Sequence, residues 1–200
     1  NMLTEAQKKS FAKLNSSRQD IPKIDKTGLV TGYCAIPWNS LMIIESGAMF
    51  NCHCQGYVTP QSSIGNILKL ESIDQFKSWF DNSEVKQGIL DLSYKACKAD
   101  ICPSLINNIN KGLNVFLKHK EQLNRIRSRT LLLDIDTSCN LKCPTCRPNL
   151  LMEKQNPLGE KILEKFNNFV LPAFDQDDEI IIRLSGGGEF LVSSIIRNYV

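Results

Sequence analysis

The sequence contains only two histidines, His53 and His119, in 200 residues. Catalytic zinc sites favour histidine and carboxylate ligands, so this scarcity argues against a zinc enzyme of that kind. No apolar run approaches the ~18 residues of a membrane span, and residues 1–15 contain no apolar core of a secretory signal. These absences predict a cytoplasmic protein, in a compartment where thiols stay reduced.

The chain also lacks a strong excess of either charge, because 24 basic and 21 acidic residues leave a net charge of +3. That value is too small to indicate a nucleic-acid partner by itself. Basic residues gather in 118–129, where Leu123 and Ile126 interrupt them. We interpret this stretch as a solvated helix face rather than as a binding patch, and we expect no nucleic-acid partner.

Cysteine is the residue that the chain has in plenty. Eight cysteines in a reducing compartment indicate metal or redox chemistry before disulfide bonds. Cys139, Cys143 and Cys146 share the stretch "SCNLKCPTCR", with the spacing C-x3-C-x2-C, and no cysteine follows them. Structural zinc and a [4Fe–4S] cube each take four ligands, so three thiolates leave one position open. On a cube, the open iron is free to hold another molecule, and on zinc a water could fill it.

Apolar patterns before residue 130 predict short elements. Residues 3–15 can form an amphipathic helix, and 41–50 reads as a hairpin around a Glu-Ser-Gly turn. Another helix is expected to open at Ser72 as the N-cap, with Gln75 at the third helical position. The residues that share one face of this helix are Ile73, Phe76 and Phe80.

From Thr130 onward, the pattern alternates between strand and helix. An apolar strand in 130–136 precedes a helical pattern over 158–170, which Pro172 closes. A second apolar strand opens the stretch 179–190 and runs into glycines, after which 191–200 begins like a helix. This order predicts a parallel sheet that is buried on both faces. Because ligands gather at the carboxyl ends of such strands, the cysteine loop and the glycines should meet at one edge.

The stretches "CNLKCPTC" and "LSGGGEF" together resemble the two signatures of radical S-adenosylmethionine (SAM) enzymes. The first is similar to the cluster loop after their first barrel strand, and the second to the Gly-Gly-Glu motif after strand two. The family commonly has an aromatic residue before the third cysteine, where this chain has Thr145, which leaves the adenine contact open. The resemblance implies that Cys139, Cys143 and Cys146 bind a [4Fe–4S] cluster and that Gly187, Gly188 and Glu189 bind the amino group of SAM.

The five upstream cysteines resemble the twitch and SPASM modules that hold an auxiliary cluster in many radical SAM enzymes. Shared features are a cysteine before Pro-Trp, a hairpin that ends in close cysteines, and a terminal cysteine pair. His53 stands where the family often has a second adjacent cysteine. A structural zinc ion on the same thiolates is the alternative, since spacing alone does not separate the two metals. The resemblance implies Cys34, Cys52, Cys97 and Cys102 as ligands, with Cys54 as the alternative ligand.

The implied fold class is α/β, the start of a partial (β/α)6 radical SAM barrel after a small α+β cysteine-rich twitch/SPASM-like domain. We expect a helix and linker in 1–28, the auxiliary module in 29–128 and the barrel portion in 129–200. The implied activity is reductive cleavage of SAM to a 5′-deoxyadenosyl radical that modifies a substrate, with a peptide favoured. A flavodoxin or ferredoxin would supply the electron, and we expect these 200 residues alone to be incompetent for catalysis. The alternative is a non-catalytic iron–sulfur or zinc module for electron transfer or protein binding.

Overall fold

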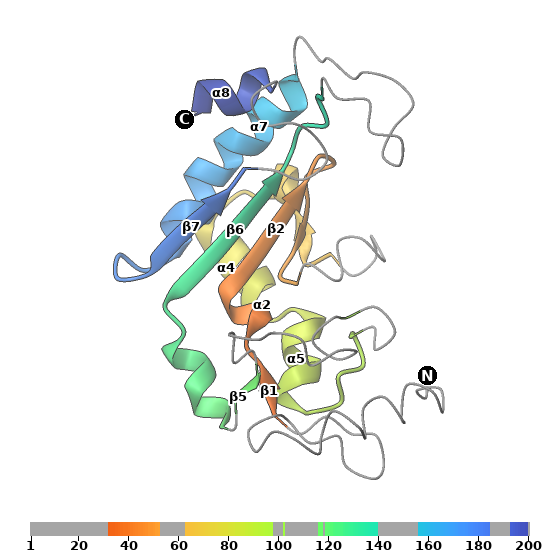
Figure 1. Ribbon diagram of the computed structural model, residues 1–200, viewed down its shortest axis with the longest axis vertical. Helices are drawn as coiled ribbons and strands as arrows, with labels where there is room; N and C mark the ends of the chain where they lie inside the picture. The colour runs from red at the N-terminus through yellow and green to blue at the C-terminus, as the bar shows by residue number, and fades with distance from the viewer. Residues whose placement is uncertain are drawn as a thin grey trace.

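The computed structural model describes residues 32–52, 63–97, 102, 116–117, 119–139, 156–184 and 193–199 (Figure 1). The fold is mixed α/β and is built on a five-stranded sheet with the strand order β4-β3-β2-β6-β7, beside a two-stranded pair β1-β5. The strands are β1 (Tyr33–Cys34), β2 (Ser40–Ile44), β3 (Ala48–Phe50), β4 (Gly65–Asn66), β5 (Phe116–Leu117), β6 (Ser128–Asp134) and β7 (Glu179–Arg183). The helices are α2 (Ile36–Asn39), η2 (Ile67–Lys69), α4 (Ile73–Asp81), α5 (Glu84–Leu90), η3 (Lys120–Arg125), α7 (Pro157–Lys165), η4 (Phe166–Val170), η5 (Leu171–Ala173) and α8 (Ser194–Tyr199).

Three neighbouring strands of the sheet, β2, β6 and β7, are parallel, whereas β3 and β4 are antiparallel to their neighbours. Ile44 at the end of β2 lies opposite Asp134 at the end of β6, and Leu132 of β6 lies opposite Arg183 at the end of β7. The carboxyl ends of all three strands therefore meet at one edge of the sheet. The predicted order of strand, helix, strand and helix after Thr130 is confirmed, with β6 and β7 as direct parallel neighbours.

The predicted hairpin in 41–50 is also confirmed, since β2 and β3 pair around a turn at 45–47. Gly47 has a φ of +79°, a conformation that side chains with a Cβ rarely adopt. A Cβ at this position would also lie 2.8 Å from Oδ1 of Asn66. Glycine is therefore required there by both the backbone and its neighbour.

Helix α4 begins as the sequence predicts. The Ser72 hydroxyl accepts a hydrogen bond from the N–H of Gln75 at 3.1 Å, which satisfies one of the open donors of the first turn. The side chain of Gln75 accepts from the N–H of Glu71 at 2.8 Å. Phe76 and Phe80 are buried on the inner face of the helix and stack with their ring centroids 5.6 Å apart.

The main core lies between the sheet and the helices α4 and α7, which both lie behind the sheet in the view of Figure 1. Each large apolar side chain buried there contributes about 1.5–3 kcal/mol to folding. Alternate residues of β2 and β6 point into this core, as the period of a strand requires. Its fully buried members include Leu41, Ile43, Phe76, Leu133, Ile162 and Phe166.

Strand β7 differs from the prediction of a strand buried on both faces. Ile180 and Ile182 pack against the core, but Ile181 is 42% exposed and Glu179 and Arg183 are exposed. The central strand β6 shows the same alternation, with Leu131 and Leu133 buried but Thr130 and Leu132 only half-buried, so the cause is that, among the described elements, this face of the sheet lacks the helices that cover the other face. The outward side chains of β7 therefore gain no covering layer within the described residues.

The five-stranded sheet joins the two segments that the sequence reading separates near residue 128. Strand β2, from the upstream segment, pairs over five residues with β6, from the downstream one. A second, smaller core forms beside the sheet around Val85, Ile89 and Cys34. The predicted helix in 3–15 and linker up to residue 28 lie outside the described residues.

Helix η3 occupies half of the basic stretch 118–129, the end of which belongs to β6. Leu123 is 2% exposed and faces inward, whereas Lys120 and Arg125 are exposed. Residues 120–125 thus agree with a solvated helix face, whereas Arg129 lies in β6, is 16% exposed and pairs with Asp178. Within the described ranges, none of the helices combines the length and the apolar character needed to cross a membrane.

Candidate functional site

The edge where β2, β6 and β7 end carries the start of the predicted cluster loop. Cys139 follows β6 by five residues and is 9% exposed. Strand β7 ends at Arg183, directly before the glycine-containing motif. The parallel pairing of the two strands thus brings the segment that leads into Cys139 and the end of β7 to the same edge of the sheet. The other predicted residues of this site, Cys143, Cys146, Gly187, Gly188 and Glu189, lie outside the described residues, and their roles stay predictions.

Asn156 ties the amino terminus of α7 to the chain segment that leads into Cys139. Its Oδ1 accepts a hydrogen bond from the N–H of Gly159 at 2.8 Å, which makes it the N-cap of α7. Its Nδ2 donates to the backbone carbonyl of Ile135 at 3.1 Å. The same side chain therefore caps a helix and holds the residue just past β6.

Asp136 makes the equivalent connection to α8. Its Oδ1 accepts from the N–H of Ser138 at 2.8 Å, and its Oδ2 accepts from the hydroxyl of Ser193 at 2.5 Å. The Ser193 oxygen in turn accepts from the N–H of Ile196 at 3.2 Å, one of the donors left open at a helix start. Asp136, Ser138 and Ser193 are each at most 5% exposed. The carboxylate thus fixes the segment before Cys139 against the helix that follows the glycine motif.

Sequence reasoning did not single out these anchoring residues. Asn156 carried a usable signal, because an Asn before Pro157 is a common start of a helix. Ser193 also stands directly before α8. Its contact with Asp136, however, joins residues 57 positions apart in the sequence, and no local pattern predicts such a contact. The buried network gives Cys139 a rigid base, which a metal-binding loop requires of its first ligand.

Two of the upstream cysteines, Cys34 and Cys97, lie next to Tyr94, a residue that the sequence analysis did not single out. The Tyr94 oxygen accepts a hydrogen bond from the N–H of Cys34 at 3.2 Å, and its hydroxyl donates to the carbonyl of Gly32. The N–H of Cys97 donates to the carbonyl of Tyr94 at 2.8 Å. Cys34 and Cys97, two of the four predicted auxiliary ligands, are thereby attached to one tyrosine.

The backbone around Tyr94 is unusual. Leu92 and Tyr94 have φ values of +59° and +49°, and side chains other than glycine rarely adopt this region. Burial raises the pKa of the Tyr94 hydroxyl, and the neighbouring Cys34 and Cys97 thiols raise it further. The tyrosine therefore stays protonated and keeps its donor for Gly32. Strained residues of this kind persist where surrounding contacts hold them, and they gather at functional sites.

The other two predicted auxiliary ligands have different surroundings. Cys102 is buried and Cys52, directly after Asn51 at the end of the hairpin, is partly exposed. Across the described ranges, no group of three or more His, Cys, Asp or Glu side chains is placed to hold a metal ion. Cys54 and His53 lie outside the described residues. The auxiliary ligand set therefore stays a prediction, with Cys34 and Cys97 as the pair that Tyr94 connects.

Comparison of the chain with protein-family models, with curated proteins and with solved structures finds no match.

Proposed function

We propose that this protein is a radical SAM iron–sulfur enzyme. The observation that carries the proposal is the parallel pairing of β6 with β7, joined through α7. It supports a shared location for the C-x3-C-x2-C loop and the Gly-Gly-Glu stretch at one edge of the sheet. Helices α4 and α7 cover one face of this sheet, which is also how the wall of a partial (β/α)6 barrel is built.

The residue types fit the proposed cofactors. Three thiolates suit an iron–sulfur cube with one open iron, and glycines allow a close backbone approach to a bound amino acid. When the cluster and SAM are bound, they would supply a reductive C–S bond cleavage that yields methionine and a 5′-deoxyadenosyl radical. Glu189 would accept a hydrogen bond from the ammonium group of SAM, and Asp136 would hold the loop base that carries Cys139.

The upstream region would hold an auxiliary iron–sulfur cluster within a twitch/SPASM-like module, with Tyr94 holding Cys34 and Cys97 in place. A zinc ion on the same thiolates is the other metal that fits the donor set. A peptide is the proposed substrate, a flavodoxin or ferredoxin the proposed reductant and the cytoplasm the proposed location. All of these follow from the resemblance of the motifs.

The test is the metal content and the SAM response of the protein, purified without oxygen and reconstituted with iron and sulfide. We expect a cluster whose electron paramagnetic resonance spectrum changes when SAM is added. Cys143→Ala should abolish this change and leave the upstream metal bound, whereas Cys34→Ala should do the reverse. Zinc as the sole metal, or an iron centre indifferent to SAM, would instead support a non-catalytic binding module.

A further inference from the structure

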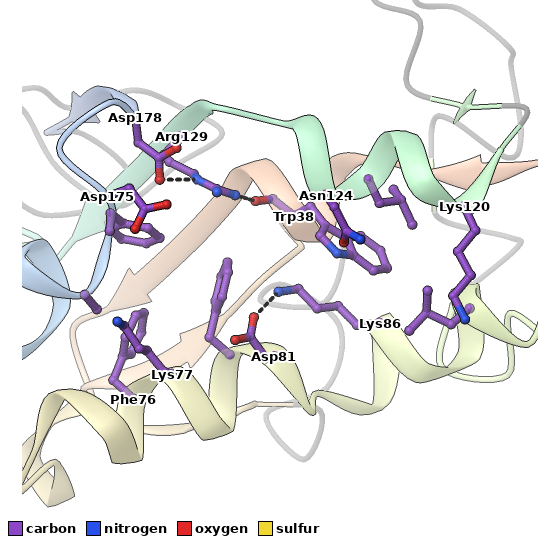
Figure 2. A pocket seen from close by; sticks show the side chains of 15 residues that line it. Trp38, Phe76, Lys77, Asp81, Lys86, Lys120, Asn124, Arg129, Asp175 and Asp178 are labelled. Carbon is purple, nitrogen blue, oxygen red and sulfur yellow. Dashed lines mark hydrogen bonds and ion pairs between the residues drawn. The ribbon is translucent and has the colours of Figure 1, made fainter.

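A second candidate site lies at the opposite end of β6 and β7 from Cys139. It is a pocket of about 540 Å³ between α4, α5, η3 and the segment that precedes β7 (Figure 2). Pockets for small molecules usually have volumes of about 300–1,000 Å³. Arg129, the second residue of β6, and Asp178, directly before β7, place it at the amino-terminal end of these strands. None of the predicted cluster or SAM ligands lines it, whereas Trp38, the helix after Ser72 and the basic stretch 118–129 do.

Lys86 is the central polar group of this pocket. Its side chain is 2% exposed, and its ammonium lies 3.6 Å from the centroid of the Phe80 ring and 5.4 Å from that of Trp38. Its Nζ donates to Oδ1 of Asp81 at 3.1 Å, a contact that Figure 2 marks by a dashed line. The amine is thus held between aromatic rings with one carboxylate beside it.

Helix α5 brings Lys86 to this place through its own start. Ser83 is the N-cap and accepts from the N–H of Lys86 at 3.4 Å. The Ser83 hydroxyl also accepts from Nδ2 of Asn51 at 2.7 Å, which joins the cap to the hairpin. Because the helix start is fixed on the sheet, the Lys86 side chain is directed inward rather than to solvent.

The charges around the pocket favour an anionic ligand. Each acidic side chain that lines it has a cationic partner: Asp81 contacts Lys86, Asp175 contacts Arg127, and Asp178 contacts Arg129. Figure 2 shows Arg129 bridging from Asp178 to the carbonyl of Trp38. The remaining cations of the lining, Lys77 and Lys120, are exposed and would attract an anionic group.

We propose that Lys86 forms an imine with a small aldehyde or ketone that carries an anionic group and binds in this pocket. In this step the Lys86 nitrogen bonds to the carbonyl carbon and the carbonyl oxygen leaves as water. Starting from the ammonium form, the product is a protonated imine, so no net proton is gained or lost. The product keeps its positive charge, and Asp81 therefore keeps its partner.

The chemistry of Lys86 suits this role. Burial lowers the pKa of Lys86 to about 8. Asp81 raises this pKa and Arg129 lowers it slightly, and both effects are smaller than that of burial. At pH 7 the uncharged amine is then about 200–300-fold more abundant than for an ordinary exposed lysine. Lysines that form imines are activated in this way, by an apolar pocket and a nearby cation. Asp81 is close enough to move a proton to or from the nitrogen as the imine forms.

The test is trapping by sodium borohydride, which reduces an imine to a stable secondary amine. The full chain is incubated with pyridoxal 5′-phosphate or with glyoxylate at neutral pH, reduced and mapped by peptide mass spectrometry. We expect the adduct at Lys86 to be about tenfold more abundant than at Lys77 or Lys120, with at least one of the two probes.

Lys86→Arg keeps the positive charge beside Asp81 but cannot form an imine, and it should lose the adduct at this position while its thermal unfolding stays close to that of the wild type. Lys161→Arg, at an exposed lysine of α7 that does not line the pocket, is the matched control and should keep the adduct at Lys86. Labelling that is equal across exposed lysines and absent from Lys86, with both probes, would overturn the proposal. The result is independent of the metal content, so it stands or falls separately from the radical SAM assignment.

Discussion

Ser193 donates a hydrogen bond to the carboxylate of Asp136 at 2.5 Å, although 57 residues separate them along the chain. This contact joins the segment before Cys139 to the start of α8, and both side chains are buried. Ser193→Ala removes the donor to Asp136 and the acceptor for the N–H of Ile196. We expect a loss of about 1–3 kcal/mol in the free energy of unfolding, measured by urea denaturation.

Ser128→Ala is the matched control for this experiment. Ser128 is exposed at the first position of β6, so the same change of residue type should alter the free energy of unfolding by less than about 0.5 kcal/mol. An equal effect of the two substitutions would show that the buried Asp136 contact adds nothing to stability.

Gly65 lies under the ring of Trp79. A Cβ at residue 65 would sit 2.3 Å from Cε3 of that ring, much closer than real contacts allow. We therefore expect Gly65→Ala to lower the free energy of unfolding by about 1–3 kcal/mol. In a Trp79→Ala background the same substitution should cost clearly less, and urea denaturation of the four proteins measures this coupling.

Gly88→Ala serves as the control. Gly88 lies inside α5, and a Cβ there would meet its nearest neighbours at 3.5 Å, an ordinary contact. Since alanine favours a helix more than glycine, this substitution should stabilise the protein by about 0.5–1 kcal/mol. A coupling energy of zero between Gly65 and Trp79 would mean that the Trp79 ring does not cause the loss of stability in Gly65→Ala.

Local features of the fold could be predicted from the sequence, because the residues that determine them are neighbours in the chain. The Ser72 cap of α4 and the hairpin around Gly47 each depend on contacts within a few residues. The parallel strands β6 and β7 follow from two apolar runs separated by one helix. The prediction for β7 failed on burial, since an apolar run does not tell whether both faces of the strand receive a covering layer.

Contacts between distant segments could not be predicted in this way. The pairing of β2 with β6 places the upstream hairpin in the same sheet as the downstream strands. No motif in the sequence predicts this pairing. Lys86 looks like an ordinary lysine of an amphipathic helix, and only the packing of Phe80 and Trp38 around it makes it a buried amine. Tyr94 is likewise distinguished only by its contact with the backbone 60 residues earlier.

Tyr94→Phe tests the connection between the two upstream cysteines. The substitution removes the oxygen that accepts from the N–H of Cys34 and donates to Gly32. We expect the free energy of unfolding to fall by about 1–2 kcal/mol, because two partly buried hydrogen bonds to the backbone are lost. If Cys34 and Cys97 bind a metal, the metal content after dialysis against a chelator should fall as well.

Tyr33→Phe is the comparison for Tyr94→Phe, because Tyr33 belongs to the same small apolar cluster. We expect this variant to retain its metal. Equal metal retention by both variants and the wild type would argue that Tyr94 does not position a ligand.

The lowered pKa of Lys86 predicts a dependence of stability on pH. The folded protein releases this proton near pH 8, whereas the unfolded chain holds it until about pH 10.5. The unfolded state therefore binds more protons in this window, and the contribution of Lys86 to stability rises with pH. The groups that face the amine are Asp81, Arg129 and the rings of Phe80 and Trp38.

Lys86→Met lacks this titration and is the reference. Between pH 7 and pH 10, the free energy of unfolding of the wild type should rise relative to Lys86→Met by about 2–3 kcal/mol, as measured by urea denaturation at each pH. Asp81→Asn removes the carboxylate that raises the Lys86 pKa, so the rise should begin at a lower pH in that variant. A constant difference between wild type and Lys86→Met across the whole range would show that the Lys86 amine titrates alike in the folded and unfolded chains. The imine chemistry would then lose its supply of uncharged amine at neutral pH.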